Sequence, residues 1–211
     1  MKSIFLSLVA ACMLSGAYAQ TLSPIQLKAP EKKAGLSVME TLANRHSTRE
    51  FSNKKLTLQE LSNLLWAANG INRSEKGMRT APSAMNAQEV DVYVCMEEGA
   101  FLYDAKSNQL QPVIQEDLRG LVGGKQAFVK NAPVVLLMVS DLSKLPGGNS
   151  EQTKLMAAID AGIVSQNISI ACSGLGLITV PRASMDKEAL AQKLKLKSTQ
   201  LLLMNNPVGK E

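Results

Sequence analysis

Pro133-Val134-Val135-Leu136-Leu137-Met138-Val139 is an unbroken apolar run that starts at a proline. Its valines are β-branched and favour extended backbone. A strand with an apolar residue at every position leaves neither face for water, so it must be covered on both sides. We therefore predict a central, fully buried strand over this run and expect the fold to be built around it.

The segment before this run predicts strands of a different kind. Val90, Val92, Val94 and Met96 alternate with other residues at a period of two, as in a β-strand. Glu98-Gly99 is a turn into a second strand over 100–106, and the polar tip 106–108 predicts another hairpin leading into 109–111. Hairpins join antiparallel neighbours, so the sheet is expected to be mainly antiparallel.

Helical patterns alternate with these strands. Ser37 caps a predicted helix through Asn44, with Val38, Leu42 and Met39 expected to face inward. A capping box at 57–60 opens a second helix that ends at Asn69-Gly70. The remaining predicted helices are a glycine-broken segment over 115–130, an amphipathic one over 186–194, and a long one over 150–173.

The long segment is apolar nearly all round, which predicts burial in a core or in a subunit interface. Residues 72–80 are polar and are expected to form a loop, whereas 177–180 and 199–204 are predicted strands. The fold class expected from this order is α+β, with a central sheet flanked by helices.

The first nineteen residues have the pattern of a secretory signal peptide. Lys2 is followed by an apolar stretch and by the small-x-small ending Ala17-Tyr18-Ala19, which predicts cleavage before Gln20 and export out of the cytoplasm. A second interpretation treats Cys12 as the lipidated residue of a lipoprotein. Residues 20–35 contain two prolines and little periodicity, as expected of a mobile or surface-wrapped arm, and 36–211 form one predicted domain.

Composition excludes several classes of function. The net charge of +5 is modest and scattered, which disfavours nucleic-acid binding. Cys95 and Cys172 lie in apolar segments and are expected to be buried free thiols. His46 is the sole histidine and no Cys-x-x-Cys pair exists, so no metal site is expected, and a Ser-His-Asp hydrolase is hard to build.

The run Arg45-His46-Ser47-Thr48-Arg49-Glu50-Phe51 carries the strongest functional signal. Two guanidinium groups four residues apart can face one dianion, because their donor forks match phosphate oxygens. The Ser47 hydroxyl and the His46 imidazole add further donors. The alternative interpretation of this run is a solvated basic helix end.

With three further motifs, the chain resembles the nitroreductase family of flavin mononucleotide (FMN) enzymes from about residue 36 to 210. Arg45, Ser47, Arg49 and Phe51 match the opening Arg-x-Ser-x-(Arg or Lys)-x-Phe signature. A Pro-Ser-x-x-Asn-x-Gln loop, a Gly-Leu-Gly end of the long helix and a terminal Pro-x-Gly-Lys follow in order, at 82–88, 174–176 and 207–210.

The resemblance implies site residues and a cofactor. FMN would be held at its phosphate by Arg45, His46, Ser47 and Lys210. Arg49 would approach the pyrimidine edge, where a fixed cation stabilises the negative charge of the reduced ring, and it is the one candidate catalytic residue. The remaining implied flavin contacts are Asn86 from the facing subunit, Ser83 close to it, and the backbone amides of Ala183 and Ser184.

The resemblance also implies an intertwined homodimer and ping-pong hydride transfer. The donor would be a reduced nicotinamide, NAD(P)H, or another donor, and the acceptor a nitroaromatic, a quinone or a similar small molecule. The chain departs from the family pattern at Asn205-Asn206, at Glu89-Val90 and at Ala183. The alternative function is an exported flavin-binding or scavenging protein without turnover.

Overall fold

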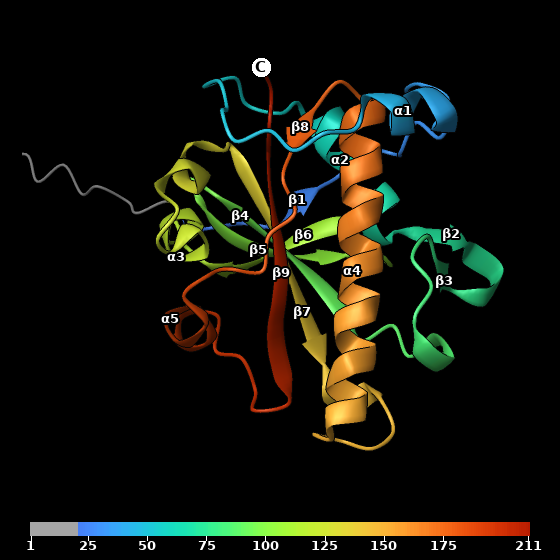
Figure 1. Ribbon diagram of the computed structural model, residues 1–211, viewed down its shortest axis with the longest axis vertical. Coiled ribbons are helices and arrows are strands. Elements are labelled where there is room, and N and C mark those ends of the chain that lie inside the picture. Colours follow the sequence, from blue (N-terminus) through green and yellow to red (C-terminus); the bar gives the residue numbers. More distant parts are fainter. Residues whose placement is uncertain (1–20) are drawn as a thin grey trace, which may run out of the picture.

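The computed structural model describes residues 21–211, so the predicted signal peptide and Cys12 lie outside the described residues. A seven-stranded sheet forms the centre of the molecule, in the order β1-β6-β5-β4-β7-β9-β8 (Figure 1). Every neighbouring pair in it is antiparallel. The strands, in sheet order, are Ile25–Gln26, Gln109–Ile114, Gly99–Asp104, Val90–Met96, Val134–Asp141, Gln200–Gly209 and Ile178–Thr179. The predicted α+β class with a mainly antiparallel sheet is confirmed.

Strand β7 is the fully buried strand that its apolar run predicts. All of its residues are buried, and alternate side chains enter two different cores. Leu136 and Met138 pack with helices α2 (Leu58–Asn69) and α4 (Glu151–Gly174), whereas Val135 and Leu137 pack with α3 (Arg119–Gly123) and α5 (Lys187–Lys193). Helices on both faces of the sheet therefore account for the lack of polar alternation in this strand.

Helix α4 runs the length of the sheet on one face (Figure 1). The side chain of Ser150 accepts a hydrogen bond from the Thr153 amide and caps its start. By length and composition α4 passes as a candidate membrane span, yet its buried residues include Asp160, Ser165 and Ser169, which face the protein interior. Helix α4 is therefore a core helix. It also has an apolar side that is exposed, at Leu155 and Ile159.

Helix α1 (Val38–Asn44) begins at the predicted cap Ser37, which forms a capping box with Glu40, and α2 begins with the predicted capping box at Thr57. The predicted inward orientation of three α1 side chains is wrong for a single chain. Val38, Met39 and Leu42 are 66%, 76% and 45% exposed, respectively. The helix instead buries Thr41, whose carbonyl accepts a hydrogen bond from the Ser173 hydroxyl on α4.

Two segments carry more regular structure than expected. Residues 71–79 form a small hairpin, β2 (Ile71–Arg73) and β3 (Met78–Arg79), around a 3₁₀ turn at Ser74–Lys76, where a loop was predicted. Strand β9 continues to Gly209, well beyond the predicted end at 204. Its polar residues Asn205 and Asn206 are fully buried because tertiary partners satisfy their amides, which no local pattern reveals.

The remaining elements complete the layers. Short 3₁₀ turns lie at Ala84–Asn86, Ala127–Asn131 and Leu142–Lys144. Residues 21–35 wrap the surface, supply the edge strand β1 and bond to α2 through Ser62 and Asn63. Cys95 and Cys172 are free and buried, as predicted.

Candidate functional site

The run Arg45–Phe51 lies where three chain segments meet. Arg45 ends α1, with its amide bonded to the Thr41 carbonyl at 2.9 Å. The Thr48 amide then donates to the Thr179 carbonyl on β8 at 3.0 Å, and the Ser52 amide donates to the Lys210 carbonyl, just beyond β9, at 2.9 Å. These bonds fix the run beside the ends of β8 and β9.

The two guanidinium groups of this run are not neutralised by the rest of the chain. Arg45 is half-buried and Arg49 is exposed, and neither guanidinium group forms a hydrogen bond or an ion pair with any of residues 21–211. Since a guanidinium carries five donors, both residues can bind an external anion without breaking an internal contact. Free guanidinium groups are compatible with the phosphate interpretation and equally with the alternative of a solvated basic helix end.

The other candidate phosphate donors differ in whether they already have a partner within the chain. Nδ1 of His46 lies 2.7 Å from the Asn44 carbonyl, which can only accept, so Nδ1 carries the proton. Ser47 is exposed. Lys210 is close to the run through its backbone, but its ammonium forms an ion pair with Glu60 at 2.8 Å. A phosphate would therefore share Lys210 with Glu60.

Ala183 and Ser184 are exposed and lie four and five residues after the end of β8 (Ile178–Thr179). Their position is set by Arg182, whose backbone exchanges two hydrogen bonds with Asn205 on β9, at 2.8 and 2.7 Å. The side-chain Nδ2 group of Asn205 also donates to the backbone carbonyl of Ser184, at 3.2 Å. The two candidate amide donors thus sit on a segment that is fixed to the sheet.

Arg182 is a buried cation without a carboxylate partner among residues 21–211. Its guanidinium donates to the carbonyls of Val122 and Gly123 and to the side chains of Asn205 and Gln126, over 2.6–3.2 Å. Burial lowers the pKa of this guanidinium. Its carbon lies 5.7 Å from the ring of Phe128, which stacks on Phe51 of the basic run. Arg182 therefore ties the segment after β8 to α3, and through Phe128 to the run.

Ser83 and Asn86 belong to the loop between β3 and β4. The Ser83 hydroxyl accepts a hydrogen bond from the Gln88 amide at 2.9 Å, and Asn86 is exposed. Met85, Asn86 and Gln88 all have positive φ, a left-handed conformation that side chains rarely adopt. Such strain persists only where surrounding contacts hold it, and it concentrates at functional sites.

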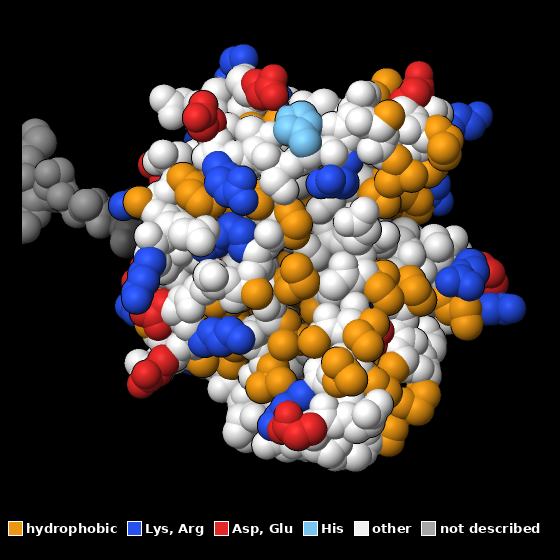
Figure 2. Space-filling view, in the orientation of Figure 1, with side chains coloured by type: hydrophobic (Ala, Val, Ile, Leu, Met, Phe, Trp, Pro, Cys, Tyr) orange, Lys and Arg blue, Asp and Glu red, His pale blue; other side chains and the backbone are white. Residues whose placement is uncertain are grey.

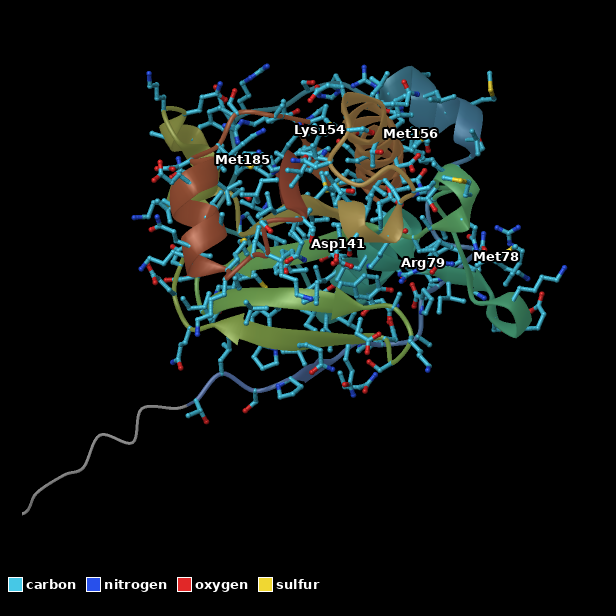
Figure 3. The ribbon with its side chains drawn as sticks, turned by 90° about the horizontal axis from the view of Figure 1, so that it is seen from below. Met78, Arg79, Asp141, Lys154, Met156 and Met185 are labelled. Carbon is cyan, nitrogen blue, oxygen red and sulfur yellow. The ribbon has the colours of Figure 1, made fainter. Side chains whose placement is uncertain are left out.

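A single chain does not bring this loop to the basic run. The Ala84 amide donates to Asp160 in the middle of α4, at 2.8 Å, whereas α1 contacts α4 near Ser173. Thirteen helical residues separate these two contacts, or about 20 Å along the axis at 1.5 Å per residue. Figure 3 also shows Arg79, next to the loop, and Met185, next to Ser184, on opposite sides of the molecule. Arg45, Ser47, Arg49 and Lys210 thus form one group and Ser83 with Asn86 another.

A buried carboxyl pair supports the same loop. Glu89 is fully buried, and neither of its carboxyl oxygens has a nitrogen or hydroxyl donor within residues 21–211. Burial and, to a smaller extent, repulsion from the adjacent Asp160 carboxyl raise its pKa to about 7. Two neighbouring carboxylates in a buried site repel each other, which favours a pair that keeps one proton near neutral pH.

A cavity of about 620 Å³ reaches Ser52, next to the basic run, but it is lined by none of the sequence-predicted site residues. Its walls are largely apolar and include Leu56, Met96 and Phe101. A cavity of about 210 Å³ does touch the basic run, through His46 and Thr48. The candidate site is therefore defined by its donors and not by the 620 Å³ cavity.

Sequence reasoning did not assign four residues that position the site. Gln88 was visible as part of a motif, and Glu89 as a departure from the family pattern. Arg79 and Arg182 carry no sequence signal, because each is a single arginine whose partners are distant in the chain.

Comparison with known proteins agrees with the four motifs and the fold. The family model described as the nitroreductase family matches residues 42–210. The chain belongs to the nitroreductase family. A provisionally named nitroreductase of Methanocaldococcus jannaschii is 30% identical over 185 residues, covering 83% of this chain and 92% of that protein.

Two further relatives extend the comparison of this nitroreductase-family chain. The crystal structure of a provisionally named nitroreductase of Ralstonia eutropha superposes with a TM-score of 0.84 and 34% identity, covering 90% of both chains. The FMN reductase [NAD(P)H] of Bacillus subtilis is 24% identical over 156 residues, covering 68% of this chain and 53% of that protein. Family and relatives identify the chain as an oxidoreductase.

Proposed function

We propose that this protein is an exported, FMN-dependent oxidoreductase. The observation that carries the proposal is the pair of un-neutralised guanidiniums, Arg45 and Arg49, beside the ends of β8 and β9 in a nitroreductase-family fold. A pair of free cations on a fixed segment is a donor set for a phosphate and for a second anionic group. The residues present therefore fit FMN.

The residues divide the work of holding this elongated ligand. Arg45, His46, Ser47 and Lys210 bind the phosphate, and Ala183 and Ser184 offer backbone amides to the ring. Asn205, which fixes those amides, and Lys210 are five residues apart along β9, about 17 Å of extended chain. This separation supports a site in which the phosphate and the ring are held at two ends of one surface.

Arg49 is the proposed catalytic residue. When bound, FMN supplies hydride transfer from a reduced nicotinamide or another donor to a nitroaromatic, quinone or similar acceptor. Arg49 holds positive charge against the pyrimidine edge, where reduction places negative charge. The side chain needs no proton exchange for this role, because a guanidinium stays charged throughout the physiological pH range.

The complete site is proposed to form in a homodimer. The viewed face of the molecule gathers apolar side chains along α4 and over α1 (Figure 2). The large exposed ones on these helices are Val38, Met39, Leu42, Leu155 and Ile159, with Met85 in the adjoining loop. A second copy packed on this face would bury them and bring Asn86 and Ser83 to the partner's basic run.

Export is proposed from residues 1–19 alone. Cell fractionation followed by N-terminal sequencing should find a soluble protein that starts at Gln20 outside the cytoplasm. A membrane-bound product that starts at a lipidated Cys12 would replace the signal-peptide interpretation with the lipoprotein one. A full-length cytoplasmic product would contradict both.

The function is tested with the mature chain from Gln20, mixed with FMN and then reduced without oxygen. Yellow protein whose visible absorption bleaches with NADH or NADPH supports a nicotinamide-dependent oxidoreductase. Yellow protein that bleaches only with another reductant contradicts the nicotinamide donor and keeps FMN binding. A colourless protein contradicts the proposal as a whole.

A further inference from the structure

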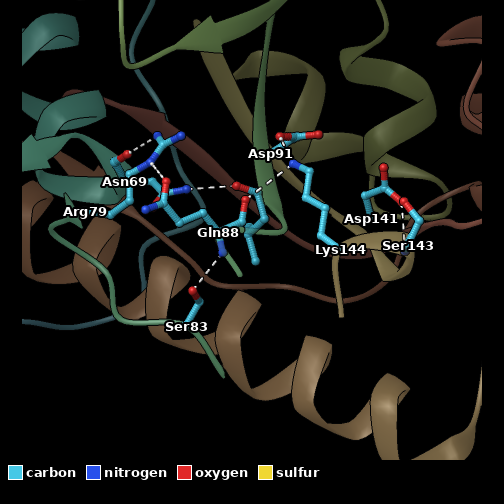
Figure 4. Close-up of polar contacts among 9 residues, drawn as sticks. Asn69, Arg79, Ser83, Gln88, Asp91, Asp141, Ser143 and Lys144 are labelled. Atoms are coloured by element: carbon cyan, nitrogen blue, oxygen red, sulfur yellow. Dashed lines mark hydrogen bonds and ion pairs between the residues drawn. The ribbon is translucent and has the colours of Figure 1, made fainter. Parts of the chain in front are cut away.

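The side chain of Gln88 is held in one orientation by partners with fixed roles (Figure 4). Its Oε1 accepts a hydrogen bond from Nε of Arg79 at 3.1 Å, and its Nε2 donates to the Gly77 carbonyl at 3.1 Å. A guanidinium can only donate and a carbonyl can only accept. Rotating the Gln88 amide by half a turn would therefore break both bonds, so its polarity is fixed.

The fixed orientation of the Gln88 amide also determines the orientation of the Asn86 side chain. The Nε2 group of Gln88 also lies 3.3 Å from Oδ1 of Asn86. Because Gln88 offers a donor on this side, the Asn86 amide must turn its oxygen inward. Its Nδ2 group is left facing outward, and it has no hydrogen-bond partner among residues 21–211.

The loop itself is anchored independently of this amide pair. Arg79 also donates through Nη1 to the Asn69 carbonyl at 2.8 Å, and Asn69 in turn donates to the Val90 carbonyl. The backbone N–H of Gln88 donates to the Ser83 hydroxyl, and Nζ of Lys144 lies 3.4 Å from the backbone carbonyl oxygen of Gln88 (Figure 4). These bonds use backbone atoms or other side chains, so they survive a change of the Gln88 head group.

We propose that Gln88 is a positioning residue that makes Asn86 a hydrogen-bond donor to its ligand. The proposal rests on the proposed function, in which Asn86 faces the flavin of the partner subunit. A donor in this position selects the acceptor atoms of the pyrimidine edge, its carbonyl oxygens, and rejects the ring N–H. Arg79 fixes the orientation of the Gln88 side-chain amide by donating to its oxygen. Gln88 in turn donates to the oxygen of Asn86, so the Asn86 Nδ2 group faces the ligand.

The substitution Gln88→Glu should reverse the orientation of the Asn86 side-chain amide, with little change in the shape of residue 88. A carboxylate accepts the bond from Arg79 but cannot donate to Asn86, so the Asn86 amide turns and donates inward. It then presents its carbonyl oxygen to the ligand. Gln88→Met removes the polarity without reversing it, and Gln192→Glu on the exposed side of α5 is a control for added charge.

The first measurement uses the dimeric protein without flavin. In an NMR spectrum of the asparagine-labelled chain, the Nδ2 protons of Asn86 are assigned by their loss in Asn86→Asp. We expect them to exchange with water at least about tenfold more slowly in Gln88→Glu than in the parent, because they become hydrogen-bonded. Equal exchange in the two proteins would overturn the relay, whatever FMN does.

The second measurement is FMN affinity by fluorescence titration. Gln88→Glu should bind FMN at least about tenfold more weakly than the parent, Gln88→Met should lie between them, and Gln192→Glu should match the parent. Equal affinity of Gln88→Glu and the parent would overturn the positioning role while FMN binding stands. A parent protein that does not bind FMN would instead contradict the proposed function, and the exchange measurement would still decide the polarity of Asn86.

Discussion

Replacing the buried Glu89 by glutamine should stabilise the protein at alkaline pH. The carboxyl group is fully buried, has no nitrogen or hydroxyl donor within residues 21–211, and lies against Asp160. Its pKa rises from 4.5 to about 7 on folding. Above pH 7 the folded protein therefore carries a buried charge that the unfolded chain would hold in water.

The size of this effect follows from proton linkage. Between pH 4.5 and 7 the folded state binds a proton that the unfolded state has lost, so the free energy of unfolding falls by about 1.4 kcal/mol per pH unit. Between pH 4.5 and pH 7 the free energy of unfolding therefore falls by about 3 kcal/mol in total. Glutamine mimics the protonated acid, because it has nearly the same shape and carries no charge.

The assay is urea unfolding at pH 5 and at pH 8, at one fixed protein concentration because association shifts apparent stability. Glu89→Gln should gain about 2–3 kcal/mol over the parent at pH 8 and less than about 1 kcal/mol at pH 5. Glu75→Gln, at an exposed turn, is the control for loss of a negative charge and should show no such pH dependence. A variant no more stable than the parent at pH 8, or equally stabilised at both pH values, would refute the reasoning.

Three further substitutions test the site, the interface and the core. Arg49→Met should slow flavin reduction at least tenfold while weakening FMN binding less, as stopped-flow and titration would show; a change in binding alone would favour a flavin carrier. Ile159→Glu should give a monomer by light scattering and weaken FMN binding, because Asn86 is then lost from the site; a dimer with unchanged affinity would place the interface elsewhere. Leu136→Ala should cost about 2–5 kcal/mol in urea unfolding, since this side chain is fully buried, and a loss below about 1 kcal/mol would contradict its place in the core.

The sequence predicts the elements whose signals are local. The apolar run over β7, the alternation in β4, the Ser37 cap of α1 and the capping box of α2 all reflect contacts within a few residues or a simple choice between inside and outside. The same holds for the basic run, because the free arginines Arg45 and Arg49 need no partner within the chain. Its position beside β8 and β9 was not visible, since the bonds to Thr179 and Lys210 join segments that are far apart in sequence.

Errors occurred where a partner from another part of the chain decides the outcome. The last strand continues through Asn205 and Asn206 because Arg182 and Ser165 satisfy these buried amides. The apolar side of α1 stays exposed because Thr41 and not Val38 faces α4, which leaves that side free for the second copy that we propose.

The sequence by itself determined the sheet-forming and helix-forming segments and the donors that an anion would meet, because periodicity and residue chemistry are properties of short stretches. Only the tertiary structure decided which of these donors are free, which way the Asn86 amide faces, and that Glu89 is buried beside Asp160. Each of these depends on burial and on hydrogen-bond partners contributed by distant segments. Burial removes water as the alternative partner, so the arrangement of those segments sets charge, polarity and orientation at the site.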